Sequence, residues 1–279
     1  MNHRIKMIGM DLDGTLLTNK KELPPYTRSV LKKAIDAGIE VVVASGRPYN
    51  GVPKELKEFE GIRYAVTSNG GRIVEIGTGE ALKEILIPQD KAEEILHIFE
   101  NYDTIPELHC HGQSYLTIGQ LPELKDMIQS PYEMQYILDS RQMVSSLWEI
   151  LEANPGGLDK VRAFFKSKEE QRKARERILQ LGGVEVVSSV EEDLEVNAAG
   201  VDKGKGMCAL GEELGIKPEE ILVFGDNEND CEMLRMCGIG VAMENAIDAA
   251  KEAADLIAGS NEEEGVAHMI DQLVFEEEE

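Results

Sequence analysis

Short apolar runs alternate along the chain with longer segments in which apolar residues recur at the spacing of a helix. The runs are too short for stable helices and are apolar at nearly every position, which is typical of strands buried on both faces. They predict strands at residues 5–10, 39–44, 64–67 and 221–224. Helices are predicted after Pro25, near Pro53 and from about Met207, so strand and helix alternate.

The stretch between the third and fourth of these strands follows a different rhythm. Two hairpins are predicted there, one from residues 72–76 and 82–87 and one from residues 108–111 and 114–118. Further strands are predicted at 160–165 and 184–188, with helices at 91–102 and 168–181. A short strand at 194–197 is expected to belong to the alternating pattern that resumes afterwards. Hairpins mixed with helices indicate an α+β unit.

The order of these elements favours one fold class. Strands that alternate with crossover helices form a parallel sheet with helices on both faces. The sequence therefore predicts an α/β protein, a doubly wound, mostly parallel sheet into which an α+β domain is inserted. We expect residues 1–82 and 189–279 to form the core and residues 83–188 to form the inserted domain. A chain of 279 residues is long enough for two domains with separate cores.

Two aspartates stand where the first strand ends. Asp11 and Asp13 are two positions apart, so their side chains share one side of an extended chain, and Gly14 then favours a turn. In an open α/β sheet the strand ends form the ligand crevice. Carboxylates placed together repel each other unless a cation or a shared proton offsets their charge. A turn that merely closes the strand is the alternative interpretation of this pair.

The strand at 221–224 ends in a second acidic loop. Residues 225–230 read Gly-Asp-Asn-Glu-Asn-Asp and are rich in oxygen ligands. Such ligands suit a hard cation, and Mg²⁺ is the cation that this composition favours. The alternative is a solvated turn in which Asn229 or Asp230 only caps the helix that follows.

The composition argues against two classes of partner. Hydrophobic residues make up 42% of the chain and charged residues 29%, as in globular proteins, and the net charge is −24. Nucleic acids and anionic membrane surfaces bind through basic patches, so neither is expected as a partner. No apolar run approaches the ~18 residues of a membrane helix, and the N-terminus lacks the pattern of a secretory signal. We therefore expect a cytoplasmic protein with reduced cysteines.

Four motifs, in this order, resemble those of the haloacid dehalogenase (HAD) superfamily of phosphohydrolases. They are residues 11–16 (Asp-Leu-Asp-Gly-Thr-Leu), 45–48 (Ser-Gly-Arg-Pro), 203–204 (Lys-Gly) and 225–230. The insertion between the second and third motifs resembles, in place and size, the cap of the Cof-type sugar-phosphatase branch. The resemblance implies a HAD-type phosphatase, a Mg²⁺-dependent enzyme that hydrolyses a small phosphorylated metabolite, with a sugar phosphate as the expected substrate.

The resemblance also implies roles for individual residues. Asp11 would be the nucleophile that forms an aspartyl-phosphate, and Asp13 the general acid and base. Mg²⁺ would be held by Asp11, Asp13 and Asp226, with Asp13 also offering its backbone carbonyl. The phosphoryl oxygens would be bound by Leu12, Gly14, Ser45, Gly46, Lys203 and Asn229. Asp230 is expected to orient either a metal-bound water or Lys203 without binding the metal itself, and Arg47 either touches the substrate or supports its own motif.

Several alternatives stay open. His109 and His111 share one side of a predicted strand and could bind zinc, face the substrate or only pack the inserted domain. Trp148 is expected in a helix core rather than in a sugar-binding platform. The reaction could instead be that of a phosphomutase or phosphotransferase with the same intermediate, or the chain could be a phosphometabolite sensor without turnover. The pair of Asp11 and Asp13 argues against the sensor, because binding alone needs no acid. No feature of the sequence indicates an oligomeric state.

Overall fold

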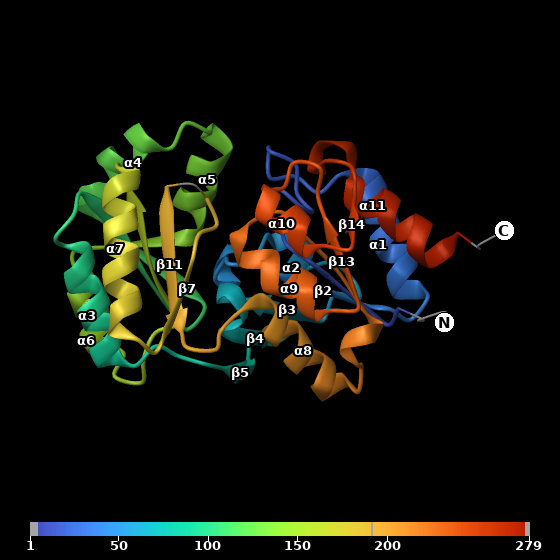
Figure 1. The fold of residues 1–279 in the computed structure, drawn as a ribbon, viewed down its shortest axis with the longest axis horizontal. Coiled ribbons are helices and arrows are strands. Elements are labelled where there is room, and N and C mark those ends of the chain that lie inside the picture. Colours follow the sequence, from blue (N-terminus) through green and yellow to red (C-terminus); the bar gives the residue numbers. More distant parts are fainter. Residues whose placement is uncertain (1–4, 191, 277–279) are drawn as a thin grey trace.

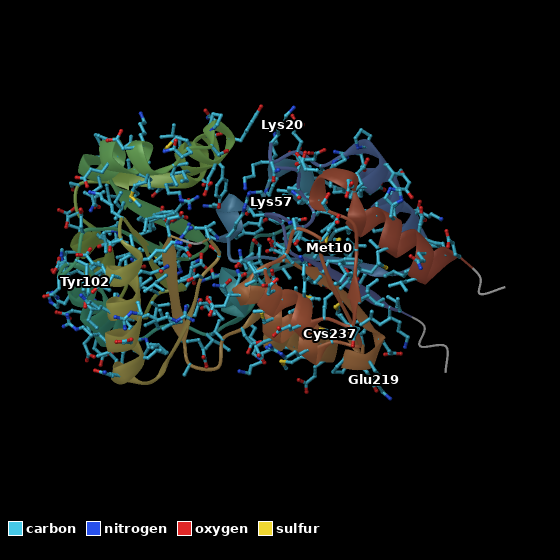
Figure 2. The ribbon with its side chains drawn as sticks, turned by 45° about the horizontal axis from the view of Figure 1, so that its top comes forward. Met10, Lys20, Lys57, Tyr102, Glu219 and Cys237 are labelled. Atoms are coloured by element: carbon cyan, nitrogen blue, oxygen red, sulfur yellow. The ribbon has the colours of Figure 1, made fainter. Side chains whose placement is uncertain are left out.

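The computed structural model describes residues 5–190 and 192–276, which form two units side by side (Figure 1). Each unit is built on one β-sheet and has a hydrophobic core of its own. Figure 2 shows Met10 inside the first unit and Tyr102 at the far side of the second. The inserted unit predicted from the change of rhythm therefore corresponds to a separate sheet.

The first unit contains an eight-stranded sheet. Its strands are β1 (Met7–Met10), β2 (Glu40–Ala44), β3 (Tyr64–Thr67), β4 (Arg72–Glu75), β5 (Ala81–Glu84), β12 (Ile221–Gly225), β13 (Ile239–Ala242) and β14 (Leu256–Ile257). Their order is β14-β13-β12-β1-β2-β3-β4-β5, and all neighbours are parallel except β3–β4 and β4–β5. Met10 pairs with Val43 on one side and Phe224 on the other, so β1, β2 and β12 end at one edge of the sheet.

Two groups of helices flank this sheet. The helices are α1 (Pro25–Asp36), α2 (Lys54–Lys57), α8 (Lys203–Leu214), α9 (Cys231–Met236), α10 (Asp248–Ala253) and α11 (Gly265–Ile270). One group is α1 with α11, and the other is α8, α9 and α10, which pack on one another in that order (Figure 1). A parallel sheet flanked by helices confirms the predicted doubly wound α/β core.

The second unit contains a six-stranded sheet in the order β10-β11-β9-β6-β7-β8. These strands are β6 (Thr104–Cys110), β7 (Gln113–Thr117), β8 (Arg141–Val144), β9 (Lys160–Phe165), β10 (Val184–Val187) and β11 (Asp193–Ala198). Its helices are α3 (Gln89–Phe99), α4 (Leu121–Met127), α5 (Pro131–Ser140), α6 (Leu147–Ala153) and α7 (Lys168–Leu181). α3, α6 and α7 pack on the strands, whereas α5 contacts the turn Tyr49–Gly51 of the first unit.

The central strands of this second sheet have one apolar and one polar face. Side chains on a strand alternate between faces. Leu108, Val161, Ala163, Leu194 and Val196 belong to the core under α3, α6 and α7. Most alternate positions are also buried but polar, and these are Glu107, His109, Lys160, Arg162, Asp193, Glu195 and Asn197. Ile105 and Phe164 are apolar exceptions on this face and belong to a smaller core with residues of α4 and α5. Because the helices cover the apolar face, the polar face is turned toward the first unit.

The structure corrects three details of the predicted organisation. The strand predicted at 194–197 is β11, which pairs with β9 and β10 of the second sheet, so assigning all of residues 189–279 to the core is wrong there. The other boundary, at residue 83, falls within β5 of the first sheet. A short buried strand looks the same in either sheet, because its own sequence does not show which strands it pairs with. α8 also begins earlier than Met207, since the side chain of Asp202 accepts a hydrogen bond from the Lys205 N–H and caps it at Lys203.

Candidate active site

Asp11 lies just beyond β1, beside the first residue of α8. Nζ of Lys203 donates a hydrogen bond to Oδ1 of Asp11 at 2.6 Å and another to Oδ1 of Asp230 at 2.6 Å. Lys203 and Asp230 have no exposed surface, and Asp11 is 6% exposed. Burial lowers the pKa of Lys203, but the two carboxylates outweigh burial and hold it above its usual range. The ammonium is therefore a fixed positive charge at the floor of the site.

The loop after β12 places Asp226 opposite Asp11. Oδ2 of Asp230 accepts hydrogen bonds from the backbone N–H groups of Asp226 and Asn227 at 2.9 and 3.0 Å, which fixes the turn. Thr15 donates from Oγ1 to Oδ1 of Asp226 at 2.7 Å. Gly14 has a φ of +80°, and a Cβ there would lie 2.4 Å from Oδ2 of Asp226. Only glycine therefore allows the two loops to approach this closely.

Asp11, Asp226 and Asp230 form an acidic cluster. Each offers a carboxylate oxygen, and these oxygens lie within 4.8 Å of one another. Burial raises the pKa of Asp11 to about 7 and that of Asp226 well above its usual range, and the neighbouring carboxylates add to both shifts. A cation relieves such crowding, and carboxylate oxygens are ligands that Mg²⁺ accepts. The donor set thus fits the predicted metal, although the cluster contains Asp230 and not the carboxylate of Asp13.

The carboxylate of Asp13 is bound by cations instead. Arg47 donates from Nε to Oδ2 at 2.7 Å and from Nη2 to Oδ1 at 2.6 Å, and Nζ of Lys21 lies 2.5 Å from the same Oδ1. Burial raises the pKa of Asp13, but the two cations outweigh burial and hold it far below its usual range. Arg47 therefore supports Asp13 directly. Its guanidinium also lies 3.8 Å from the ring centre of Tyr136, on α5 of the second unit.

Ser45, Gly46 and Asn229 line the same pocket as Asp11 and Asp13. Ser45 directly follows β2, and its Oγ accepts a hydrogen bond from the Arg47 N–H at 3.2 Å. Asn229 donates from Nδ2 to Oδ1 of Asn69 at 3.1 Å. Leu12 and Gly14 belong to the turn after β1. The predicted phosphate-binding groups thus come from loops that meet at one edge of the sheet, and their contacts with phosphate stay a prediction.

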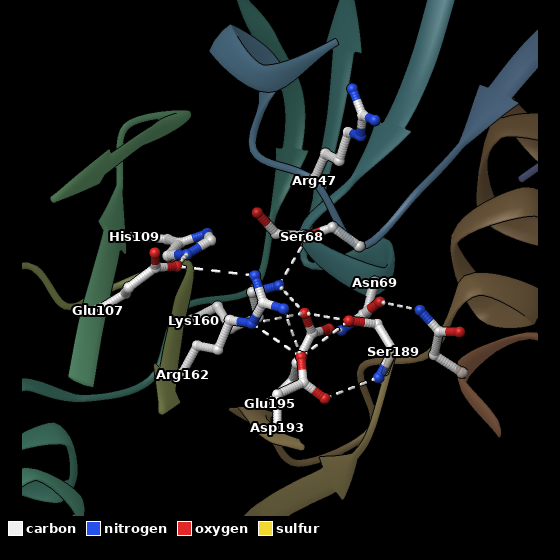
Figure 3. Close-up of polar contacts among 12 residues, drawn as sticks. Arg47, Ser68, Asn69, Glu107, His109, Lys160, Arg162, Ser189, Asp193 and Glu195 are labelled. Carbon is white, nitrogen blue, oxygen red and sulfur yellow. Dashed lines mark hydrogen bonds and ion pairs between the residues drawn. The ribbon is translucent and has the colours of Figure 1, made fainter. Parts of the chain in front are cut away.

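The polar face of the second sheet forms the opposite wall of the pocket. His109, Lys160, Arg162 and Glu195 line it from β6, β9 and β11 (Figure 3). Nζ of Lys160 donates to the carbonyl oxygen of Gly46 at 2.7 Å and lies 2.8 Å from Oε1 of Glu195. The second unit is therefore bonded directly to the loop that carries the second motif.

Sequence reasoning missed most of this wall. Arg141, Tyr136 and Ser189 also line the pocket, and none of them was predicted as a site residue. One signal was present, since Lys160 and Arg162 occupy alternate positions of a run that otherwise reads as a buried strand. Two charges on one face of a buried strand indicate a polar interior surface.

The remaining candidate residues, His111 and Trp148, do not line the pocket. His111 lies in the turn between β6 and β7 with a φ of +51° and does not join His109 in a metal site. Among residues 5–190 and 192–276, the acidic cluster is the only group of three His, Cys, Asp or Glu side chains placed to share an ion. Trp148, on α6, donates from Nε1 to Oε1 of Glu100 at 3.0 Å, on the outer side of the second unit. No helix in these ranges is long and apolar enough to cross a membrane.

Comparison with known proteins identifies the class that this fold and site define. A sequence model of the haloacid dehalogenase-like hydrolases matches residues 8–270, nearly the whole described chain. The chain therefore belongs to the haloacid dehalogenase-like hydrolase family, which confirms the resemblance seen in its four motifs, including that to the Cof-type branch. Within this family it is a phosphatase, because several curated relatives that it matches over nearly their whole length are named phosphatases.

Relatives and solved structures cover the chain almost completely. The 5-amino-6-(5-phospho-D-ribitylamino)uracil phosphatase YitU of Bacillus subtilis is 28% identical over 95% of this chain and 96% of its own. The pyridoxal phosphate phosphatase YbhA of Escherichia coli is 26% identical over 95% of this chain and 97% of its own. A solved haloacid dehalogenase-like hydrolase from B. subtilis is 30% identical, with a TM-score of 0.86 over 96% of this chain and all of that one.

Proposed function

We propose that the protein is a Mg²⁺-dependent phosphomonoesterase that hydrolyses a sugar phosphate through an aspartyl-phosphate on Asp11. The position of Asp11 carries this proposal. It lies between the ammonium of Lys203 and the acidic loop, in a pocket that residues of the second unit also line. The names of two relatives support a small phosphorylated metabolite as the substrate, and one of them names a ribityl phosphate, a hydroxylated chain.

Asp11 is the proposed nucleophile. Its carboxylate attacks phosphorus in line, the bond to the leaving alkoxide breaks, and water then cleaves the aspartyl-phosphate. Lys203 holds Oδ1 of Asp11 and thereby orients the carboxylate. Donors aimed at the phosphoryl oxygens stabilise the charge that develops in the transition state. We assign this task to Lys203, Ser45, Asn229 and the backbone N–H groups of Leu12, Gly14 and Gly46.

The acidic cluster is the proposed magnesium site. Asp11 and Asp226 would hold the ion with their carboxylates, and Asp13 with its backbone carbonyl. When bound, the ion supplies positive charge that offsets the repulsion between the nucleophile and the phosphoryl group. Asp230 accepts hydrogen bonds both from Lys203 and from the backbone of the acidic loop, so it fixes the position of Lys203 relative to that loop.

Asp13 is the proposed general acid and base. It would protonate the leaving alkoxide and later accept a proton from the attacking water. Arg47 and Lys21 hold it ionised, which suits the second step. A phosphoryl dianion that enters the pocket attracts the same two cations. Their hold on Asp13 then weakens, and its pKa rises toward the value that the first step requires.

The second unit is the proposed cap. Inserted between β5 and α8, it would close over the phosphoryl site, exclude water from the aspartyl-phosphate and select the substrate. The ion pair between Arg175 on α7 and Glu228 of the acidic loop, at 2.5 Å, joins the two units at this point. The cap residues that line the pocket are therefore the ones to test for substrate selection.

A phosphate-release screen tests the proposed function. The protein is incubated with sugar phosphates, other phosphorylated metabolites and p-nitrophenyl phosphate, each with Mg²⁺ and with EDTA. We expect free phosphate only with Mg²⁺, and the highest kcat/KM for a sugar phosphate. Phosphate transfer to an acceptor without release would identify a mutase or phosphotransferase instead. Binding without any turnover would identify a sensor.

A further inference from the structure

One nitrogen on the cap wall of the pocket is buried without a partner. Nδ1 of His109 has no hydrogen-bond partner within the described residues, although the side chain is 1% exposed. A buried polar atom that stays unpaired costs free energy, so such atoms are rare and call for an explanation. His109 lines the pocket that also contains Asp11 and Asp13. The side chain that carries the unpaired nitrogen therefore belongs to the wall that a bound substrate would face.

The neighbour of His109 decides what this nitrogen can do. Nε2 of His109 lies 3.4 Å from Oε2 of Glu107, a carboxylate with no exposed surface (Figure 3). Burial raises the pKa of Glu107, but Arg141, His109 and Arg162 lower it below its usual range, so Glu107 is ionised and can only accept. Nε2 must then carry the hydrogen. Burial and the cations Lys160 and Arg141 lower the pKa of His109 to about 4, so the ring is neutral near pH 7 and Nδ1 is an acceptor.

The charges around His109 are already balanced. Each cation on the polar face pairs with a carboxylate, at 3.1 Å for Arg141 and Glu107, 2.8 Å for Lys160 and Glu195, and 2.6 Å for Arg162 and Asp193. A second phosphate would have to compete with these buried pairs, which is costly. This wall therefore favours a neutral group that donates a hydrogen bond, and an alcohol hydroxyl fits that description.

We propose that Nδ1 of His109 accepts a hydrogen bond from one hydroxyl of the leaving group and makes His109 a specificity-determining residue. The inference rests on the proposed function and deepens it. It identifies the substrate as a hydroxylated monophosphate and disfavours bisphosphates. Loss of that one hydroxyl leaves Nδ1 unpaired beside a bound substrate, which costs about 10- to 100-fold in kcat/KM.

The test measures kcat/KM for ribose 5-phosphate, ribitol 5-phosphate and glucose 6-phosphate, with the monodeoxy analogues of each. p-Nitrophenyl phosphate serves as a probe without an alcohol, and glucose 1,6-bisphosphate as a probe with a second phosphate. With the best parent sugar phosphate, the wild type should lose about 10- to 100-fold on one deoxy analogue. His109→Phe should lose as much on the parent and nothing further on that analogue. The substitution should reduce kcat/KM for p-nitrophenyl phosphate less than kcat/KM for the parent sugar phosphate.

Ser114→Ala is the matched control. Ser114 faces His109 across the β6–β7 register, and its Oγ is also buried and unpaired, but it does not line the pocket. All its kcat/KM values should equal those of the wild type. If His109→Phe fails to fold, the inference is tested by the kcat/KM values of the wild type on the monodeoxy analogues, which need no variant.

Other outcomes separate this inference from the proposed function. An equal wild-type response to every deoxy analogue would overturn the role of His109, since a resident water then satisfies Nδ1. Equal losses for His109→Phe on all substrates, including p-nitrophenyl phosphate, would make the residue structural. Turnover of p-nitrophenyl phosphate with none of the sugar phosphates would leave the phosphatase standing and remove the inference. Absence of phosphate release from every ester would overturn both.

Discussion

The two walls of the pocket carry buried charge in different balance. On the core side, the three carboxylates of Asp11, Asp226 and Asp230 crowd around the single ammonium of Lys203, while Asp13 has cations of its own in Arg47 and Lys21. On the cap side, the carboxylates and cations of the polar face pair one to one. Uncompensated buried charge requires a bound counter-ion, whereas balanced charge does not. The core wall is therefore suited to bind a cation and, with it, a reacting anion such as a phosphoryl group. The cap wall is suited to bind neutral groups.

The largest expected effect is the loss of activity when Asp11, at the centre of the core wall, is replaced. Asp11→Asn keeps the shape of the side chain but removes the nucleophile, so we expect phosphate release to fall by at least ~10⁴-fold. Far-ultraviolet circular dichroism should be unchanged, because Lys203 keeps its ion pair with Asp230. Asp36→Asn, an exposed aspartate at the end of α1, is the control and should retain full activity. Activity within tenfold of the wild type would remove Asp11 from the nucleophile role.

The next effect separates the two steps of the reaction. Asp13→Ala should slow hydrolysis of a sugar phosphate by the ~10²–10⁴-fold typical of general acid catalysis, because an alkoxide needs a proton as it leaves. A nitrophenolate leaves without one, so formation of the aspartyl-phosphate from p-nitrophenyl phosphate should slow much less. Rapid-mixing measurement of nitrophenol release isolates that first step. Equal losses on both substrates would contradict the acid role of Asp13.

The core wall could be anticipated from the sequence because its signals are local. Short apolar runs indicate buried strands, and parallel strands deliver their ends to one edge. Asp11 and Asp226 are 215 positions apart and still meet, as expected for residues at the ends of the neighbouring parallel strands β1 and β12. The sequence did not indicate the side-chain partners. The carboxylate of Asp13 faces Arg47 and Lys21, a pairing that depends on side-chain directions that periodicity does not determine, and its part in metal binding, through its backbone carbonyl, stays a prediction.

The cap wall could be anticipated only in outline, because its pairs are set by register between distant strands. Glu107 and His109 of β6 stand opposite Arg162 and Lys160 of β9, and Glu195 of β11 stands on the other side of Arg162. Single strands showed the alternation of charges but not which charges would meet. The same cause misplaced β11. The sheet to which β11 belongs is decided by its two partner strands. One is β9, about thirty residues earlier in the chain, and the other is β10, which directly precedes it.

A third prediction breaks the balance of the cap wall. Arg162→Met removes the cation between Asp193 and Glu107 and leaves buried carboxylates unpaired, which should destabilise the second unit by about 3–5 kcal/mol. Urea denaturation followed by the fluorescence of Trp148 reports this unit, since Trp148 lies on α6 and is the single tryptophan of the chain. Arg172→Met is the control. It removes an exposed pair with Glu176 on α7 and should cost no more than ~0.5 kcal/mol. An equal loss of unfolding free energy in both variants would show that the buried ion pairs of Arg162 stabilise the second unit no more than an exposed pair does.

The smallest expected effect tests whether His109 is neutral. Its pKa is lowered from 6.5 to about 4 in the fold, chiefly by burial and also by Lys160 and Arg141, although Glu107 opposes the shift. Between these two values the unfolded chain binds a proton that the folded chain does not, so stability falls as the pH is lowered from 6.5 toward 4.

The two pKa values bound this loss at about 3 kcal/mol. His109→Phe has no such group, so its Trp148-monitored free energy of unfolding should fall less than that of the wild type between pH 7 and pH 5. The difference between the two slopes is the measured quantity, because carboxylates that titrate at lower pH affect both proteins alike. His268→Phe, in the first unit, should follow the wild type. Parallel slopes for wild type and His109→Phe would mean that His109 gains its proton equally well in the fold, and a protonated ring has no acceptor nitrogen to offer a substrate hydroxyl.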